Sequence, residues 1–217
     1  MIPKILHQIW VGEEMPDTHK KYMETVKEKH PDWDYKLWTN DNLDNFLTKE
    51  FISRYDLKVI RPAFLVDLLR IEILKKVGGV YLDADTECQK PIDSFVKQDR
   101  DFITAVFRGE GSRLTWCFML NCFFGTEKDG RMINLLSKGL SLNSEQMKKY
   151  DATGGFGAIN FHNVVVANAD HTTTIYGENY FQRLHHRRKD KINPDAYLVH
   201  HTTCSWKKGK MIKVEVE

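Results

Sequence analysis

The sequence has little of what marks several specialised classes of protein. It contains no apolar run near the roughly 18 residues that a membrane-spanning helix needs, and no secretory leader, repeat or low-complexity segment. Its four cysteines follow no zinc-binding spacing. We therefore expect one globular domain over residues 1–217, located in the cytoplasm and holding reduced thiols. These cysteines are Cys88, Cys117, Cys122 and Cys204.

The charge balance excludes a further class of protein. The chain has 32 basic and 30 acidic residues, a net charge of +2, which is too little to indicate a nucleic-acid partner. The basic residues nevertheless gather in two runs, at 183–191 and 207–210. A solvated surface loop accounts for these runs. Attraction to an anionic acceptor, or peripheral association with the inner face of the membrane, is the alternative.

Strand and helix patterns alternate through the first half of the chain. We expect strands at 4–11 and 34–38, helices at 17–29, 49–55 and 63–77, and an amphipathic stretch at 40–47 that Asn40 caps. This order predicts an α/β fold with a mostly parallel central sheet flanked by helices. Further along we expect strands at 101–107 and 117–124 and a helix at 127–139. The glycine-rich turn at 153–157 lacks the lysine of a P-loop.

The most informative segment follows the helix at 63–77. It reads Gly78-Gly79-Val80-Tyr81-Leu82-Asp83-Ala84-Asp85. Because side chains alternate along a strand, Asp83 and Asp85 should point the same way where the strand ends. Such a pair often lies in a solvated turn. It is also the kind of oxygen-ligand pair that holds a divalent cation together with substrate phosphates.

Two charged residues precede this segment on the apolar helix. Asp67 and Arg70 lie three positions apart, and therefore on one face of it. A structural ion pair explains them. A charged pair at the edge of a site, kept because a ligand uses it, explains them as well.

These residues together resemble family 32 of the glycosyltransferases. That family includes the yeast initiating mannosyltransferases and bacterial capsular-polysaccharide transferases, and it shares a core with the clostridial glucosylating toxins. Residues 2–12 and 31–38 resemble its first two strands. The ending, with His200-His201 and Ser205-Trp206, is similar to its C-terminal histidine and Ser-Trp signature.

The resemblance implies a GT-A fold and a retaining glycosyltransferase. The donor would be a nucleotide-sugar, with a UDP-sugar favoured and a GDP-sugar as the second choice. The acceptor would be a glycan or lipid-linked saccharide in surface polysaccharide synthesis. Mn²⁺ or Mg²⁺ would be held by Asp85, with Asp83 beside it, while Asp67 and Arg70 would lie next to the donor sugar.

The resemblance also suggests residues for the rest of the site. Candidates for donor binding are Ile9, Trp10, Tyr81, Asp83, Asn121 and Trp206. Trp10 either stacks on the nucleobase or belongs to the core. Only one of His200 and His201 can face inward from a strand, and His200 is the first choice as a further metal ligand. We expect the segment from His200 to Trp206 to act as a lid that orders over the donor.

Two other classes of function stay open at this point. A metal-dependent nucleotidyl or phosphoryl transferase would also use paired carboxylates, but it should carry a lysine-containing phosphate loop near the first strand. In this chain Gly12 is followed by Glu13-Glu14. A non-catalytic carbohydrate-binding protein would use exposed aromatic side chains, for which Trp33, Trp38 and Trp116 are the candidates.

Overall fold

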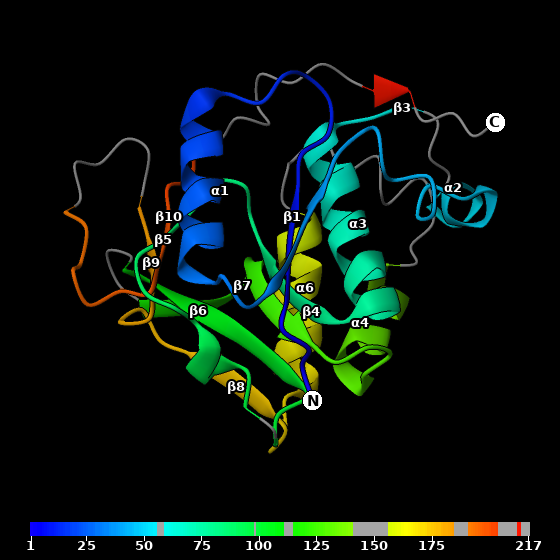
Figure 1. Ribbon diagram of the computed structural model, residues 1–217. Helices are drawn as coiled ribbons and strands as arrows, with labels where there is room; N and C mark the ends of the chain where they lie inside the picture. Colours follow the sequence, from blue (N-terminus) through cyan, green and yellow to red (C-terminus); the bar gives the residue numbers. More distant parts are fainter. Residues whose placement is uncertain are drawn as a thin grey trace.

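A six-stranded mixed sheet lies at the centre of the fold (Figure 1). The computed structural model describes residues 1–55, 59–97, 99–110, 115–140, 156–184, 191–203 and 212–213. Three of the five pairings in this sheet are parallel and two, both made by β7, are antiparallel. The predicted α/β fold with a mostly parallel sheet is confirmed. The sheet order is β2 (Asp34–Trp38), β1 (Ile5–Ile9), β4 (Gly79–Leu82), β7 (Thr115–Thr126), β6 (Phe102–Glu110) and β8 (Thr173–Tyr176).

Two hydrophobic clusters occupy the two faces of this sheet. One is covered by α2 (Lys49–Tyr55), α3 (Pro62–Val77), α4 (Arg131–Leu140) and α6 (Phe156–Asn168). The other is covered by α1 (Asp17–Lys29), the short 3-10 helix η1 (Asp93–Phe95) and a three-stranded sheet. The order in that smaller sheet is β5 (Thr86–Cys88), β10 (Leu198–His200) and β9 (Phe181–Arg183). A separate two-stranded sheet pairs β3 (Val59–Ile60) with β11 (Ile212–Lys213).

The alternation of side chains along β4 explains how one short strand serves both clusters. Val80 and Leu82 pack into the cluster beneath α1, whereas Tyr81 packs into the cluster beneath α3. All three are almost fully buried. A strand that is buried on both faces is typical of a central position in a sheet, and this position directs the end of β4 into the interior.

The glycine pair that precedes β4 is required by backbone geometry. Gly78 ends α3 with φ 76°, and Gly79 follows with φ 109°. A Cβ atom at Gly79 would lie 2.6 Å from the carbonyl oxygen of Ile5 and 2.8 Å from Nε2 of His7. Only glycine combines the left-handed conformation with this close approach. The helix expected at 63–77 is confirmed, with Pro62 as its first residue and Gly78 directly after its end.

Two local predictions were wrong. Residues 40–47 form turns rather than a capped helix, because the Asn40 side chain exchanges two hydrogen bonds with the backbone of Gly12, at 3.1 and 3.0 Å. The helix expected from residue 127 begins at Arg131, because residues 127–130 turn and Asp129 adopts φ 52°. In both places a turn satisfies backbone groups that a helix would otherwise use.

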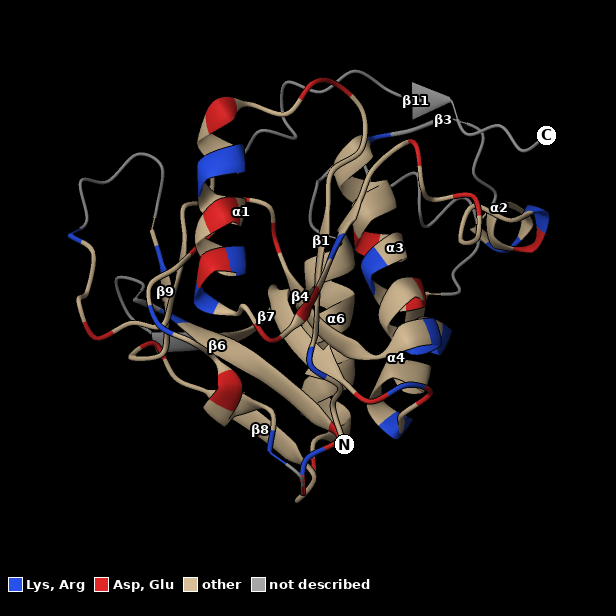
Figure 2. Cartoon of the chain, viewed as in Figure 1, with Lys and Arg blue, Asp and Glu red and all other residues tan. Residues whose placement is uncertain are grey.

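Most charged residues lie at the surface of these layers (Figure 2), although Arg70 and Asp85 are buried. Lys, Arg, Asp and Glu lie along α1, on α2 and in the connecting loops, whereas α6 carries none. Within the described ranges, no helix has both the length and the apolar character that crossing a membrane requires.

A buried histidine next to the glycine pair gives the fold a predicted acid sensitivity. His7 contacts the carbonyl oxygen of Gly78 through Nε2 at 2.8 Å and accepts a hydrogen bond from Trp38 Nε1 at 3.0 Å. Burial lowers the pKa of His7 to about 4, although the Gly78 bond opposes this effect. The unfolded chain therefore binds more protons than the folded chain between about pH 6.5 and 4. The free energy of unfolding should fall across this window by up to roughly 3 kcal/mol on account of His7.

Urea denaturation at pH 7 and pH 4.5 tests this expectation. His7→Asn should be less stable at pH 7, since it disturbs a buried hydrogen-bonded site, but its stability should depend less steeply on pH. His171→Asn is the matched control, because His171 is exposed. An unchanged pH dependence in His7→Asn would contradict the assignment.

Candidate active site

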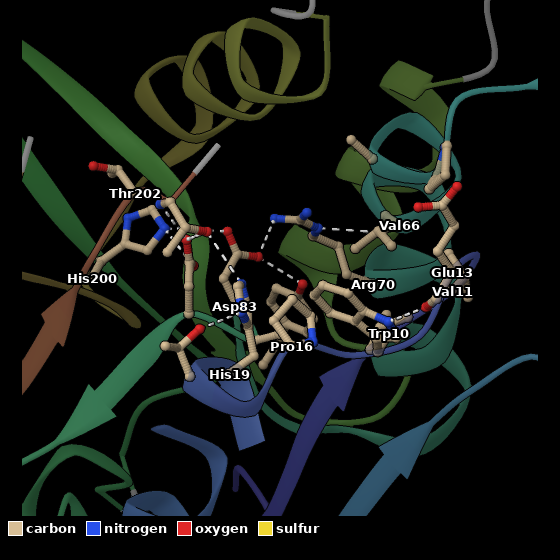
Figure 3. Close-up of a pocket in the computed structure, with 18 of the residues that line it drawn as sticks. Trp10, Val11, Glu13, Pro16, His19, Val66, Arg70, Asp83, His200 and Thr202 are labelled. Atoms are coloured by element: carbon tan, nitrogen blue, oxygen red, sulfur yellow. Dashed lines mark hydrogen bonds and ion pairs between the residues drawn. The ribbon is translucent and has the colours of Figure 1, made fainter. Parts of the chain in front are cut away.

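A cavity of about 550 Å³ opens at the carboxyl ends of β1 and β4 (Figure 3). Ligands of open α/β sheets bind at this edge. Ile9 and Trp10 line it from the end of β1, Arg70 lines it from α3, and His200 lines it from β10. The cavity therefore brings together residues that are far apart in the sequence.

The two aspartates lie on a turn rather than on the strand. β4 ends at Leu82, and the turn is closed by a hydrogen bond from the Thr86 N–H to the Asp83 carbonyl oxygen at 3.0 Å. The expectation that both follow one alternating strand was therefore wrong. Their carboxylates converge nevertheless, since Nε2 of His200 lies 3.6 Å from Oδ2 of Asp83 and 3.0 Å from Oδ1 of Asp85.

Asp83 is oriented by a tyrosine and an arginine. Its Oδ1 accepts a hydrogen bond from the Tyr81 hydroxyl at 2.7 Å and pairs with Arg70 Nη1 at 3.2 Å. The guanidinium of Arg70 lies 4.6 Å from the centre of the Tyr81 ring. The carboxylate beside the cavity is thus fixed by two neighbours from the protein core.

Asp67 and Asn121 lie behind Arg70 and do not line the large cavity. Asp67 Oδ1 pairs with Arg70 Nη2 at 3.0 Å and accepts from Asn121 Nδ2 at 2.9 Å. Arg70 also donates to the carbonyl oxygen of Asn121 at 2.6 Å. Burial raises the pKa of Asp67 to about 6, although the charge of Arg70 acts in the opposite direction. Asp67 therefore positions the guanidinium of Arg70 against Asp83.

Asp85 is held by residues that the sequence did not indicate. Its Oδ2 accepts hydrogen bonds from the Thr203 N–H at 2.8 Å and the Thr203 hydroxyl at 2.9 Å. That hydroxyl in turn lies 3.2 Å from Nε2 of the buried His19 on α1. No motif marks His19 or Thr203. Their roles depend on contacts across more than a hundred residues of chain.

Charge pairing dominates the electrostatics of this part of the cavity. Burial favours the neutral acid, but His200 and the hydrogen bonds from Thr203 more than compensate and hold the pKa of Asp85 well below its usual range. Burial lowers the pKa of His200, whereas its neighbours Cys122 and Asp85 raise it well above the ordinary value. The two side chains therefore form a carboxylate–imidazolium pair.

The two adjacent histidines take opposite directions. His200 faces the aspartates, while His201 stacks on Tyr22 with ring centres 4.1 Å apart and pairs with Glu87 at 2.8 Å. This arrangement agrees with the choice of His200 as the inward residue. Its ligation of a metal stays a prediction.

The donor set suits a divalent cation. Carboxylate oxygens of Asp83 and Asp85 and an imidazole nitrogen of His200 meet at one place, and Mn²⁺ accepts both kinds of ligand. A bound cation would take the place of the proton between His200 and Asp85, because a metal-ligating histidine is neutral. The residues present therefore fit the ion.

Trp10 forms a wall of the cavity. It is half-buried, donates from Nε1 to the carbonyl oxygen of Glu13 at 2.7 Å, and meets His19 edge-on with ring centres 4.9 Å apart. Trp206, and with it the distal part of the expected lid from residue 204, lies outside the described residues. The proximal part is tied to the sheet by β10 and by the bonds between Thr203 and Asp85.

The fold is that of the GT-A class of glycosyltransferases, as comparison with solved structures shows. Two solved structures share this architecture. One is the PaToxG glycosyltransferase, with a TM-score of 0.54 and 17% identity over 76% of this chain and 69% of that one. The other is a glycosyltransferase involved in the glycosylation of the major capsid of PBCV-1, with a TM-score of 0.51 and 15% identity over 95% of this chain and 96% of that one.

The chain belongs to the family of capsular polysaccharide synthesis proteins, whose family model matches residues 2–152. Among curated relatives, inositol phosphoceramide mannosyltransferase 3 of Schizosaccharomyces pombe is 35% identical over 95 residues, which is 42% of this chain and 26% of that protein. The chain thus spans about a quarter of the length of this relative. The resemblance to the mannosyltransferase and capsule family is thereby confirmed.

Removal of the Thr203 hydroxyl should destabilise the site. Thr203→Val keeps the backbone N–H bond but deletes the hydroxyl bond to the Asp85 carboxylate. Because hydrogen bonds to charged groups contribute about 1.5–3 kcal/mol, we expect a loss of that size in the free energy of unfolding, measured by urea denaturation at pH 7. Thr203→Ser retains the hydroxyl and should lose much less. Equal losses in the two variants would show that the hydroxyl contributes nothing.

Proposed function

We propose that this chain transfers a sugar from a nucleotide-sugar donor to a saccharide or lipid-linked acceptor, with the help of a divalent cation and with retention of the anomeric configuration. The observation that carries the proposal is the convergence of Asp83, Asp85 and His200 beside Trp10 in a cavity of about 550 Å³. Such a cavity has room for a nucleoside diphosphate and part of a sugar.

The donor is proposed to enter with its base toward Trp10 and its diphosphate toward the aspartates. Ile9 and Trp10 line the cavity from the end of β1, and Trp10 lies on the opposite side of Asp83 from His200 (Figure 3). Asp83 is held by Tyr81 and Arg70 and stands at the centre of the lining, where it can accept hydrogen bonds from sugar or ribose hydroxyls. Rigid support of this kind preorganises a binding group.

The metal is proposed to be Mn²⁺ or Mg²⁺, held by Asp85, Asp83 and His200. When bound, it would neutralise the charge that develops on the leaving diphosphate. The protein supplies the rest of the chemistry by position: Thr203 fixes one oxygen of Asp85, so that the other faces the cavity. Arg70 pairs with Asp83 at 3.2 Å and so keeps its carboxylate in place beside Asp85.

The proposed reaction proceeds on one face of the sugar. The bond between the anomeric carbon and the diphosphate oxygen breaks, the acceptor oxygen bonds to the same carbon, and the acceptor proton passes to the departing phosphate oxygen. Both aspartates already have partners: Asp83 contacts Tyr81 and Arg70, and Asp85 contacts Thr203 and His200. Neither stands free as a nucleophile, which supports this front-face course.

The finer identity of the substrates is part of the proposal. A UDP-sugar is favoured as donor on the resemblance to the uridine-using toxins, with a GDP-sugar second. The name of the fission-yeast relative suggests a mannosyl group, and the family description suggests an acceptor in capsule or surface polysaccharide synthesis. A cytoplasmic location, peripheral to the inner face of the membrane, is proposed on the same resemblance.

Neither alternative function is favoured by the structure. Glu13 and Glu14 line the cavity where a phosphate-binding lysine loop would be needed. Trp33, a candidate carbohydrate platform, is 6% exposed and donates to Asp93, and Trp38 packs against His7 and Phe46. The side chain of Trp116 lies outside the described residues.

Asp85→Asn should abolish most of the transfer activity. The substitution keeps the size of the side chain and removes the charge that would meet the cation, so several kcal/mol of transition-state stabilisation, or orders of magnitude in rate, should be lost. The measurement is nucleotide release from a panel of UDP- and GDP-linked sugars, with and without Mn²⁺. Asp195→Asn, on the exposed surface, is the matched control. Metal-independent turnover, or an active Asp85→Asn enzyme, would refute the metal-dependent proposal.

Trp10→Ala should weaken nucleotide binding by about 1–3 kcal/mol, the usual contribution of one stacked base. Trp10→Phe should retain much of the affinity, because a phenyl ring still offers a flat face. Calorimetric titration with UDP and with GDP measures the difference and also ranks the two bases. Unchanged affinity in a folded Trp10→Ala protein would assign Trp10 to the core alone.

A further inference from the structure

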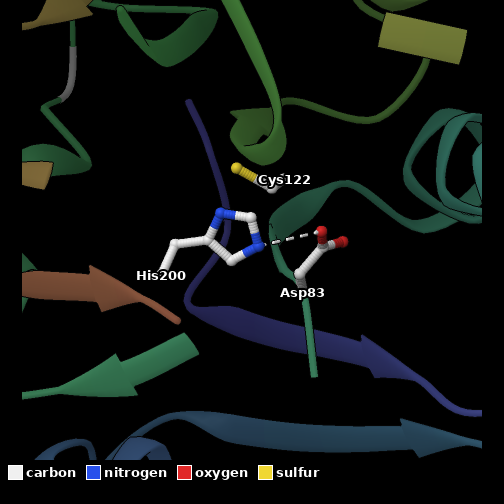
Figure 4. Close-up of side chains that lie close together, drawn as sticks. All are labelled: Asp83, Cys122 and His200. Atoms are coloured by element: carbon white, nitrogen blue, oxygen red, sulfur yellow. Dashed lines mark ion pairs between the residues drawn. The ribbon is translucent and has the colours of Figure 1, made fainter. Parts of the chain in front are cut away.

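A cysteine thiol lies beside the aspartates and the histidine. Asp83, Cys122 and His200 each offer one ligand atom, and these atoms lie within 4.8 Å of one another (Figure 4). They come from three elements: the turn after β4, the middle of β7 and the end of β10. The sheet itself fixes two of them, because the Asp83 N–H donates to the Cys122 carbonyl oxygen at 2.9 Å.

Two of these side chains are shielded from bulk solvent. His200 is 8% exposed and Cys122 is 4% exposed. Nε2 of His200 faces Asp83 at 3.6 Å, so Nε2 is the nitrogen that would meet an ion shared with Asp83. An ion among these side chains would be coordinated mainly by protein atoms.

We propose that Asp83, Cys122 and His200 form a site for a thiophilic divalent cation of the Zn²⁺ type. Sulfur, nitrogen and oxygen together are the ligands that Zn²⁺ takes in proteins, whereas Mg²⁺ takes oxygen alone. Ligand atoms around a tetrahedral Zn²⁺ lie roughly 3.5 Å apart, given Zn–S and Zn–N distances of about 2.3 and 2.0–2.1 Å. Small side-chain rotations would bring the three atoms to that spacing. Binding would release the thiol proton of Cys122 and the proton that His200 shares with Asp85.

The site has a consequence for the reaction proposed above, and this part rests on that proposed function. A Zn²⁺ ion held by Cys122 would use Asp83 and His200, which the Mn²⁺ or Mg²⁺ of the transfer reaction also needs. The two kinds of ion would then exclude one another. Thiolates select soft cations over hard ones, so Zn²⁺ should act as an inhibitor that competes with the activating ion.

Optical titration with Co²⁺, a spectroscopic substitute for Zn²⁺, tests the site without any assay of transfer. The complete, chelator-treated chain should develop the near-ultraviolet charge-transfer absorption of a cobalt–thiolate bond, and Zn²⁺ should abolish it. Cys122→Ser should lose this absorption and bind Zn²⁺ at least about tenfold more weakly. Changing a residue that only supports a metal ligand already lowers metal affinity by about that factor, and Cys122 would be a ligand itself. Cys117→Ser is the matched control, since Cys117 lies on the same strand and is exposed.

Cobalt binding without the thiolate absorption, or absorption that persists in Cys122→Ser, would overturn the proposal. If Cys122→Ser does not fold, a chain in which the other cysteines, Cys88, Cys117 and Cys204, are replaced by serine must keep the absorption. If Co²⁺ does not bind through Cys122, the proposal of a Zn²⁺ site is wrong but the proposal of Mn²⁺-dependent transfer is unaffected. If the chain binds Co²⁺ through Cys122 but transfers no sugar, the proposed reaction is wrong and the proposed Zn²⁺ site stands.

Discussion

The buried guanidinium of Arg70 is the interaction on which the site depends. It is 6% exposed and joins Asp67 of its own helix, Asp83 after β4 and the Asn121 carbonyl of β7. A buried cation is tolerated only when it is paired and hydrogen-bonded. In this fold the pairing of Arg70 therefore depends on α3, the end of β4 and β7 meeting at its guanidinium. The position of Asp83 follows from that requirement.

The balance of charge around Arg70 explains why the cavity suits a cation and a diphosphate together. Three carboxylates, those of Asp67, Asp83 and Asp85, face two cationic partners, Arg70 and His200. With all three carboxylates counted as ionised, these groups carry one net negative charge, and a divalent cation that displaced the His200 proton would bring the sum to zero. A site that has lost its negative charge no longer repels a diphosphate, which can then complete the coordination of the cation. Cation and donor should accordingly bind with mutual reinforcement.

Local features of the site could be predicted from the sequence because local chemistry determines them. Pro62 and Gly78 set the ends of α3, and Gly79 adopts a backbone conformation that is open only to glycine. Asp83 directly follows a short buried strand. The helix expected at 40–47 failed because Asn40 bonds to Gly12, a partner 28 positions away. His19, Cys122 and Thr203 were missed for a similar reason. Their contacts exist only after distant strands have paired, and no spacing along the chain encodes such contacts.

The division of the cavity between two parts of the chain has a functional consequence. The residues matched by the family model, 2–152, supply Trp10, Arg70, Asp83 and Asp85. The facing wall comes from later residues: β10 contributes His200, and Thr203 follows it. The smaller sheet holds this wall in place, because β10 pairs with β5 directly after the aspartate turn. The cavity is therefore complete only with β10 and Thr203 in place. Because His200 and Thr203 also hold Asp85, changes at these two residues should disturb the aspartates as well as the wall, whereas changes elsewhere in β9 and β10 can reshape the wall alone.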